Sequence, residues 1–263
     1  MVQIKYFLFL IILLPSIQYL NSTDATFKFF SEDCNGHLFI FYNRIQQTES
    51  ITKELVLGKF NYRNSTRFTK IDSKYSAKEI YLNKQVYEAF IEMYDAASKD
   101  GINLKILSGT RNFNEQKAIW ERKWLKYKDL NPKERAKKIL EYSSMPSTSR
   151  HHWGTDLDLN SLNNSYFNSG IGYEEYKWLK ANANRFGFYQ VYTSKSKGRT
   201  GYNLEKWHWS YLPLANKYLN YYNSHIDYND IKGFKGDYLA TEMNMINDYV
   251  NGLSKKVIDY RNK

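Results

Sequence analysis

The stretch "TSRHHWGTDLDL", residues 148–159, combines two adjacent histidines with two aspartates that alternate with leucines. Successive side chains of a β-strand point to opposite faces. Leu157 and Leu159 should therefore share one face of a strand, and Asp156 and Asp158 the other. The pattern predicts a strand with one apolar face and one carboxylate face, directly after a pair of histidines.

A second segment, "GYNLEKWHW" at residues 201–209, places Glu205 three residues before His208. A catalytic zinc ion takes three protein ligands from His, Asp, Glu or Cys and keeps one position open for water. One histidine and one aspartate of the first segment would complete such a set with His208 and leave Glu205 as a general base. The alternative is that His208 packs between two core tryptophans and that the histidine pair lies on the surface.

The rest of the chain mixes helix and strand signals without regular alternation of the two. Residues 83–98 carry apolar side chains at helical spacing, with Asn83 as a helix-capping residue, and residues 102–107 alternate like a strand. Further helices are expected at residues 114–127, 132–142 and 173–185, and further strands at residues 188–192 and 205–212. This mixture favours an α+β fold.

The composition indicates one sizeable folded domain, because 42% of the 263 residues are hydrophobic and the chain has four prolines and no linker rich in Gly and Ser. The net charge of +11 suits anionic surroundings such as cell-wall polymers or phospholipid headgroups. The basic residues form no single stripe and accompany no recognised nucleic-acid-binding module, which argues against nucleic acid as a partner. Cys34 is the only cysteine, so no intrachain disulfide can form.

The N-terminus has the pattern of a secretory signal. Lys5 precedes the apolar run "YFLFLIILL" at residues 6–14. Signal peptides have about 7–15 apolar residues after a short positive region, whereas a membrane-spanning helix needs about 20. Residues 1–22 are therefore expected to be a signal peptide or an uncleaved anchor, which would be the only membrane contact. The protein would be exported to the periplasm, the cell envelope or the medium, with residues 23–263 as its single domain.

Four motifs in order resemble those of the VanY-type D,D-carboxypeptidases, relatives of the D-Ala-D-Ala dipeptidases with a hedgehog-like fold. "SRHHWGTDLD" fits S-x-H-x-x-G-x-x-x-D, "EKWHW" resembles E-x-W-H-W, and "SGTRNFNEQ" resembles S-G-Y-R-S-x-x-x-Q. "YKWLKANANRFGF", followed by "TGYNLEKWHW", is also similar to the family. The resemblance covers about residues 70–213 and implies an antiparallel sheet with flanking helices around a zinc cleft.

The resemblance implies a role for each residue of the two histidine segments that matches the family pattern. One zinc ion per chain would be held by His151, Asp158 and His208. Glu205 would be the catalytic base, which takes a proton from the attacking water and passes it to the leaving amine. The residue types suit this chemistry, because zinc lowers the pKa of bound water to about 7, within reach of a carboxylate base.

The same pattern implies how the rest of the cleft is built. Arg111 matches the arginine that binds the substrate carboxylate or stabilises the tetrahedral intermediate. Gln116 and Ser149 match polar positions that line the cleft and bind substrate. His152 would then pack against the cleft wall. Asp156, which replaces the alanine common in the family, would be an acceptor that orients a zinc ligand.

The reaction implied by the resemblance is removal of the terminal D-alanine from peptidoglycan stem peptides that end in D-Ala-D-Ala, by a monomeric enzyme. Within the enzyme class, the alternatives are a D,D-dipeptidase and an endopeptidase that cuts L-Ala-D-Glu bonds or cross-links. Outside it, one alternative is a hedgehog-like zinc module without catalysis. The other is a basic wall-binding protein whose histidines are incidental.

Overall fold

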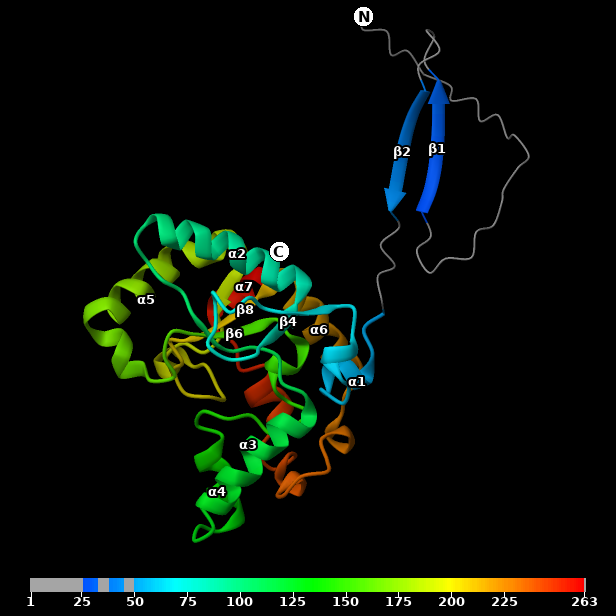
Figure 1. Ribbon diagram of the computed structural model, residues 1–263. Helices are drawn as coiled ribbons and strands as arrows, with labels where there is room; N and C mark the ends of the chain where they lie inside the picture. The colour runs from blue at the N-terminus through cyan, green and yellow to red at the C-terminus, as the bar shows by residue number, and fades with distance from the viewer. Residues whose placement is uncertain (1–25, 33–37, 45–49, 263) are drawn as a thin grey trace, which may run out of the picture. The chain divides into compact units, whose positions relative to one another are not determined.

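The chain divides into two compact units at Ser50 in a computed structural model that describes residues 26–32, 38–44 and 50–262 (Figure 1). The first unit contains an antiparallel strand pair, β1 (Thr26–Glu32) with β2 (Leu38–Arg44). The domain predicted from the sequence starts at residue 23, whereas the compact unit with the remaining helices and strands begins at Ile51.

Two expectations fall on residues whose structure is not described. These are the signal peptide or anchor at residues 1–22 and the single cysteine, Cys34. Over the described ranges, no helix has the length and apolar character that a membrane crossing requires.

A four-stranded antiparallel sheet with the order β5–β6–β8–β7 forms the centre of the second unit. Its strands are short: β5 (Ile106–Ser108), β6 (Asp156–Leu159), β7 (Phe188–Gln190) and β8 (His208–Tyr211). A separate two-stranded sheet pairs β3 (Phe68–Lys70) with β4 (Tyr81–Asn83). Helices and antiparallel strands are thus combined as the α+β prediction requires.

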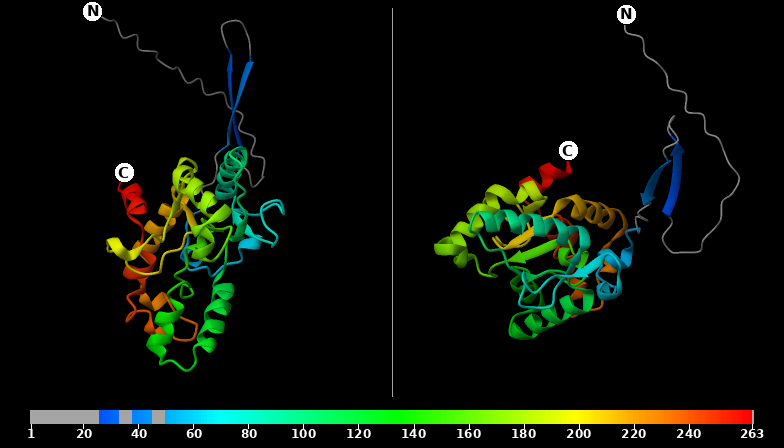
Figure 2. Two further views of the ribbon diagram at one scale, coloured as in Figure 1. Left: turned by 90° about the vertical axis from the view of Figure 1, so that its left-hand side faces the viewer. Right: turned by 45° about the horizontal axis from the view of Figure 1, so that its top comes forward.

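One face of the four-stranded sheet is covered by α2 (Lys84–Lys99) and α5 (Gly170–Asn182), as Figure 2 shows. The side chains of Leu157, Leu159 and Trp209 pack there with the buried face of α2. The alternation read from "TDLDL" is therefore correct for its leucines. The aspartates of β6 point to the other face, where they are buried as well.

The remaining helices build a second apolar core, which includes Trp120, Trp153 and Tyr222. These helices are α1 (Lys53–Val56), α3 (Phe113–Lys126), α4 (Pro132–Ile139), α6 (Leu212–His225) and α7 (Lys255–Arg261). Short helical turns lie between the helices and strands of this unit: η1 (Tyr62–Asn64), η2 (Arg150–Trp153), η3 (Asn164–Asn168), η4 (Ala183–Phe186), η5 (Lys195–Lys197), η6 (Tyr228–Asp230), η7 (Asp237–Leu239) and the π-helical η8 (Met245–Val250).

Local sequence explains where the two long helices near the site begin. The Asn83 side chain accepts a hydrogen bond from the backbone N–H of Gln85, as expected of a helix cap. At the start of α3, Asn112 and Glu115 form a reciprocal capping box. The cap residue Asn112 directly follows Arg111, so the start of α3 and the Arg111 side chain lie next to each other at the cleft.

Candidate metal centre and cleft

The register between β6 and β8 brings two of the expected metal ligands together. Asp158 pairs directly with His208, and Asp156 pairs with Ser210. Because alternate residues of a strand share a face, these four side chains all point away from the leucines of β6. The Oδ1 atom of Asp158 lies 3.2 Å from Nδ1 of His208.

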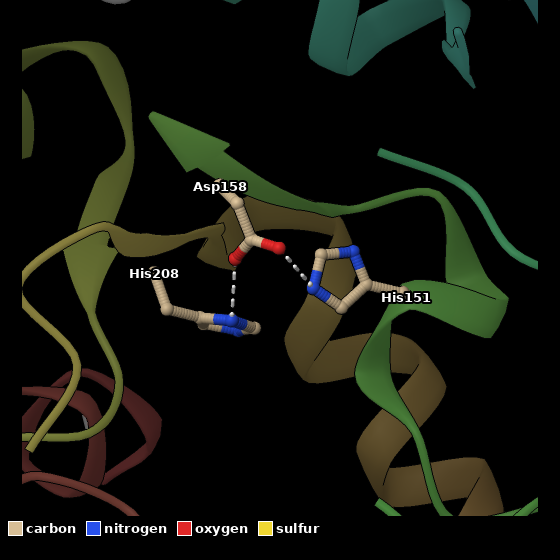
Figure 3. Close-up of side chains that lie close together, drawn as sticks. All are labelled: His151, Asp158 and His208. Carbon is tan, nitrogen blue, oxygen red and sulfur yellow. Dashed lines mark ion pairs between the residues drawn. The ribbon is translucent and has the colours of Figure 1, made fainter. Parts of the chain in front are cut away.

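The η2 turn supplies the third expected ligand, His151. Its Nδ1 atom lies 2.7 Å from the carbonyl oxygen of Gly109, so this nitrogen carries the proton and donates it. The other ring nitrogen, Nε2, is then free to bind a cation and lies 3.4 Å from Oδ2 of Asp158. Figure 3 shows both histidine rings directed at the Asp158 carboxylate, each facing one of its two oxygens.

The three side chains fit a metal ion such as zinc. One ligand atom from each of His151, Asp158 and His208 lies within 4.8 Å of the others. Atoms bound tetrahedrally at about 2.0–2.1 Å from zinc are roughly 3.3 Å apart, and each histidine lies at a similar distance from one of the two Asp158 oxygens. The Oδ1 atom of Asp158 is buried and makes no hydrogen bond of good geometry, which a cation would correct.

The protonation state of Asp158 suits cation binding. Burial by itself would raise the pKa of its carboxyl group. The neighbouring His151 and His208 outweigh burial and hold that pKa well below its usual range. The carboxylate is therefore ionised at neutral pH.

Asp156 lies behind His208 and fixes the orientation of its ring. Its Oδ2 atom lies 2.8 Å from Nε2 of His208 and accepts a hydrogen bond from Nε of Arg150 at 2.9 Å. Its Oδ1 atom accepts hydrogen bonds from Ser210 at 2.7 Å and Thr155 at 2.6 Å. When His208 donates its Nε2 proton to Asp156, Nδ1 is the nitrogen presented to the metal position. These contacts are those that an orienting role requires.

Glu205 lies just before β8 and beside the ligand cluster. Its Oε2 atom is 3.5 Å from Nδ1 of His208, and its side chain is buried. Burial is the main cause that raises the pKa of Glu205 to about 8, against the opposite effect of His208 and Arg111. A carboxylate with a raised pKa is a stronger base than an exposed one, which suits proton transfer near neutral pH.

Arg111, Gln116 and Ser149 lie in the same cleft, which has a volume of about 740 Å³. Arg111 donates from Nε to Oε1 of Gln116 at 3.1 Å, and its Nη1 atom contacts the Ser108 hydroxyl. Nη1 also lies 3.8 Å from Oδ2 of Asp158. Gln116 in turn donates to the carbonyl oxygen of Ser144 at 2.8 Å. The Ser149 hydroxyl is buried without a hydrogen-bond partner among the described residues.

His152 points away from the ligand cluster and is fully buried. Its Nδ1 atom lies 2.7 Å from the carbonyl oxygen of Arg111, and its Nε2 atom accepts the backbone N–H of Ser147 at 3.1 Å. Both ring nitrogens are thus used by the protein backbone. The structure therefore places His152 in the wall behind the cleft and separates it from the metal position.

Sequence reasoning missed three polar side chains of this region. Arg150 and Ser210 bind Asp156, and Lys123 lines the cleft from α3. Ser210 follows His208 by two residues, so the strand alternation could have placed both on one face. Arg150 and Lys123 gave no signal, because basic residues are frequent throughout the chain.

About half of the chain matches a known protein family. The family model VanY, described as D-alanyl-D-alanine carboxypeptidase, matches residues 79–214. A D-alanyl-D-alanine carboxypeptidase of Enterococcus faecalis is 33% identical over 128 residues, which are 47% of this chain and 45% of that protein. One of Enterococcus faecium is 29% identical over 136 residues, or 51% and 39% of the two chains. The chain therefore matches less than half the length of these curated relatives.

Among solved structures, the LD-carboxypeptidase LdcB superposes with a TM-score of 0.50 and 21% identity, covering 77% of this chain and 80% of that chain. At this identity the likeness concerns the fold alone. It confirms the hedgehog-like, D,D-peptidase-type fold that the sequence motifs implied.

Proposed function

Because the chain belongs to the VanY family of D-alanyl-D-alanine carboxypeptidases, we propose that it is a zinc-dependent peptidase that removes the terminal D-alanine of peptidoglycan stem peptides. One observation carries the proposal: the buried cluster of His151, Asp158 and His208 shares its cleft with Glu205 and Arg111. The cleft therefore combines a metal position, a base and a carboxylate-binding cation. The partner is a stem peptide that ends in D-Ala-D-Ala, and an exported enzyme would meet it in the cell envelope.

Each of these residues of the cleft has its own role in the proposed reaction. His151, Asp158 and His208 would hold zinc, which would supply Lewis-acid polarisation of the scissile carbonyl group and of the attacking water. Glu205 takes a proton from that water and passes it to the leaving amine of D-alanine. Arg111 binds the terminal carboxylate through two parallel hydrogen bonds or stabilises the developing oxyanion. Gln116 holds the guanidinium in place through its contact with Nε.

The metal and the base can be tested separately. Purified protein should contain about one zinc ion per chain, and a chelator should abolish D-alanine release until zinc is added back. Glu205→Gln should retain zinc but lose most turnover, because the amide cannot accept the proton, whereas His208→Ala should lose both. Metal analysis and D-alanine release measure the two properties. Full turnover by the Glu205→Gln protein would exclude Glu205 as the base.

The substrate is tested with defined muropeptides and mass spectrometry. A pentapeptide should lose one D-alanine and a tetrapeptide should stay intact. Amidation of the terminal carboxylate should reduce cleavage sharply, because it removes the charge that Arg111 recognises. Arg111→Lys should do the same, because an ammonium group cannot reproduce two parallel hydrogen bonds. Release of a dipeptide would instead indicate a D,D-dipeptidase. Cutting of L-Ala-D-Glu bonds or of cross-linked dimers would indicate an endopeptidase.

A further inference from the structure

One face of α3 forms a wall of the cleft beside Arg111. Gln116, Ile119 and Lys123 follow each other at intervals of three and four residues, which places them on one face of the helix, and all three line the cleft. The ammonium group of Lys123 contacts the hydroxyl group of Ser143. In residues 50–262, no ion pair joins Lys123 to a carboxylate.

The cleft lining carries more positive than negative charge. Its cationic side chains are Lys78, Arg111, Arg122, Lys123 and Arg150, of which Arg150 is paired with Asp156. Among the lining residues, the acidic ones are Asp158 and Glu205. A bound Zn²⁺ would offset the charges of these two carboxylates, so four cations would remain without compensation. A substrate whose only carboxylate is the terminal one would pair with Arg111 and leave the other three cations without an anionic partner.

Besides Arg111, Lys123 is the partly buried cation of this group, whereas Lys78 and Arg122 are exposed. Burial is the main cause that lowers its pKa, while the Glu205 carboxylate raises that pKa and the Arg111 guanidinium lowers it. Lys123 is thus partly desolvated, lies within electrostatic range of the base and the arginine, and has only a neutral hydroxyl as partner. A carboxylate placed between Lys123 and Ser143 would complete this arrangement.

We propose that Lys123 forms a second anion-binding subsite, which takes a carboxylate carried by a residue that precedes the scissile bond. The inference rests on the proposed function, because Arg111 is assigned to the terminal carboxylate. Stem peptides offer two such groups: the free carboxylate of the D-glutamate residue and, where the third residue is diaminopimelate, the carboxylate of its side chain. The subsite would make the enzyme selective for stem peptides that keep one of these charges.

The test compares three pentapeptides that end in D-Ala-D-Ala. The first has both upstream carboxylates free, the second has the diaminopimelate carboxylate amidated, and the third has the glutamate carboxylate amidated. For the wild-type enzyme, one of the two amidations should lower kcat/KM for D-alanine release by about tenfold or more, as expected for loss of one charge-assisted hydrogen bond. The affected peptide identifies which carboxylate the subsite takes.

The variant Lys123→Met keeps the unbranched side chain up to its last atom and removes its charge. It should lower kcat/KM on the free peptide by the same factor and show a much smaller further loss on the sensitive amidated peptide. Lys126→Met is the matched control, because Lys126 lies on the same helix, is exposed and does not line the cleft. It should act like the wild type on all three peptides.

If Lys123→Met lowered kcat/KM by the same factor on all three peptides, the proposal would be overturned, since Lys123 would then act at the terminal carboxylate or on the fold. The proposal would also be overturned if Lys123→Met lowered kcat/KM on none of the peptides. If the wild type released no D-alanine from any peptide, the proposed function would fail instead. Calorimetric binding of the same peptides to zinc-loaded protein would then decide the inference: a Lys123-dependent preference for the free carboxylate supports it, and equal affinities overturn it.

Discussion

The buried Asp156 controls which nitrogen of His208 faces the metal position. It holds Nε2 of His208 and is itself fixed by Arg150, Ser210 and Thr155. Asp156→Asn should weaken zinc binding about 10–100-fold, the usual cost of losing such an orienting partner. The measurement is a competition titration against a chromophoric chelator. An unchanged affinity would mean that His208 is oriented without Asp156.

Asp156→Asn also leaves the buried Arg150 guanidinium without its anionic partner, which costs about 3–5 kcal/mol of stability in comparable buried pairs. The double variant Arg150→Met with Asp156→Asn removes both charges and should recover much of that stability. Zinc affinity should stay low in the double variant, because His208 still lacks its charged acceptor. If the double variant recovered zinc affinity as well as stability, the loss of zinc binding in Asp156→Asn would be due to the destabilised fold and not to the orientation of His208.

The ligand cluster could be predicted from sequence to the extent that its members lie in motifs of fixed spacing. The strand alternation put Asp156 and Asp158 on one face, but it could not decide which of them contacts a metal, and only the family resemblance separated them. The structure supplies the physical difference. Asp156 is enclosed by donors on both oxygens, whereas Asp158 keeps a buried oxygen without a hydrogen bond.

At the scale of elements, helices could be predicted more accurately than strands. The helix expected at residues 83–98 is α2 (Lys84–Lys99), because capping and apolar spacing are local properties. The strand expected at residues 102–107 is reduced to Ile106–Ser108. The reason is that Asn160 binds this segment through its side chain, accepting from the N–H of Lys105 and donating to the carbonyl oxygen of Asn103.

The strand expected at residues 205–212 begins only at His208 for a similar reason. The carbonyl oxygen of Glu205 accepts from the Gln190 side chain, and the N–H of Lys206 donates to the Asn164 side chain. Side-chain partners from distant segments thus replace part of the sheet ladder, although the backbones of Glu205 and Trp207 still bond to those of Tyr192 and Leu159. No local pattern in the sequence reveals such partners, although they place Glu205 in a loop that reaches the cleft.

The turn between His151 and β6 depends on Gly154, which has a φ of +67°. A Cβ atom there would lie 2.4 Å from the Phe68 ring and 2.9 Å from the Thr110 hydroxyl. Gly154→Ala should therefore lower thermal stability and weaken zinc binding, because the turn that positions His151 must shift. Thermal unfolding and zinc titration measure the two effects.

Gly101 is the matched control for this substitution, because it has a similar φ of +75° and a Cβ atom there would meet no other atom within 4 Å. Gly101→Ala should cost only the backbone strain, about 1–2 kcal/mol, and leave zinc affinity unchanged. Equal effects of the two substitutions would mean that close packing around Gly154 does not hold the ligand turn.

At the scale of the whole molecule, His152 joins three segments that are distant in sequence. Its ring donates to the carbonyl oxygen of Arg111, accepts from the N–H of Ser147, and leaves no room for a side chain at Gly58, where a Cβ atom would lie 2.4 Å from its Nδ1. Ser147 has a φ of 70°, which is unfavourable for a residue with a side chain, and the Tyr222 hydroxyl donates to its carbonyl oxygen. The two adjacent histidines thus differ in their surroundings, since His151 lies in the candidate metal cluster and His152 in the packed wall, and a local sequence pattern cannot show this difference.

The buried position of His152 makes stability depend on pH. Burial is the main cause that lowers its pKa from 6.5 to about 3, against the raising effect of its hydrogen bond to the Arg111 backbone. An unfolded chain binds this proton near pH 6.5 and the folded protein only near pH 3, so protonation favours unfolding. The stabilising contribution is complete above pH 6.5 and is lost progressively as pH falls towards 3.

Between pH 7 and pH 5, this single group should remove about 2 kcal/mol from the free energy of unfolding of the metal-free protein. His152→Gln can still donate and accept a hydrogen bond but does not titrate. The variant should be less stable than the wild type at pH 7, yet lose about 2 kcal/mol less on acidification to pH 5. Urea unfolding at the two pH values gives the loss of unfolding free energy for each protein. The contributions of all other titrating groups cancel when the two losses are subtracted. Parallel losses in the two proteins would show that His152 is protonated in the folded state, and the architecture assigned to its ring would be wrong.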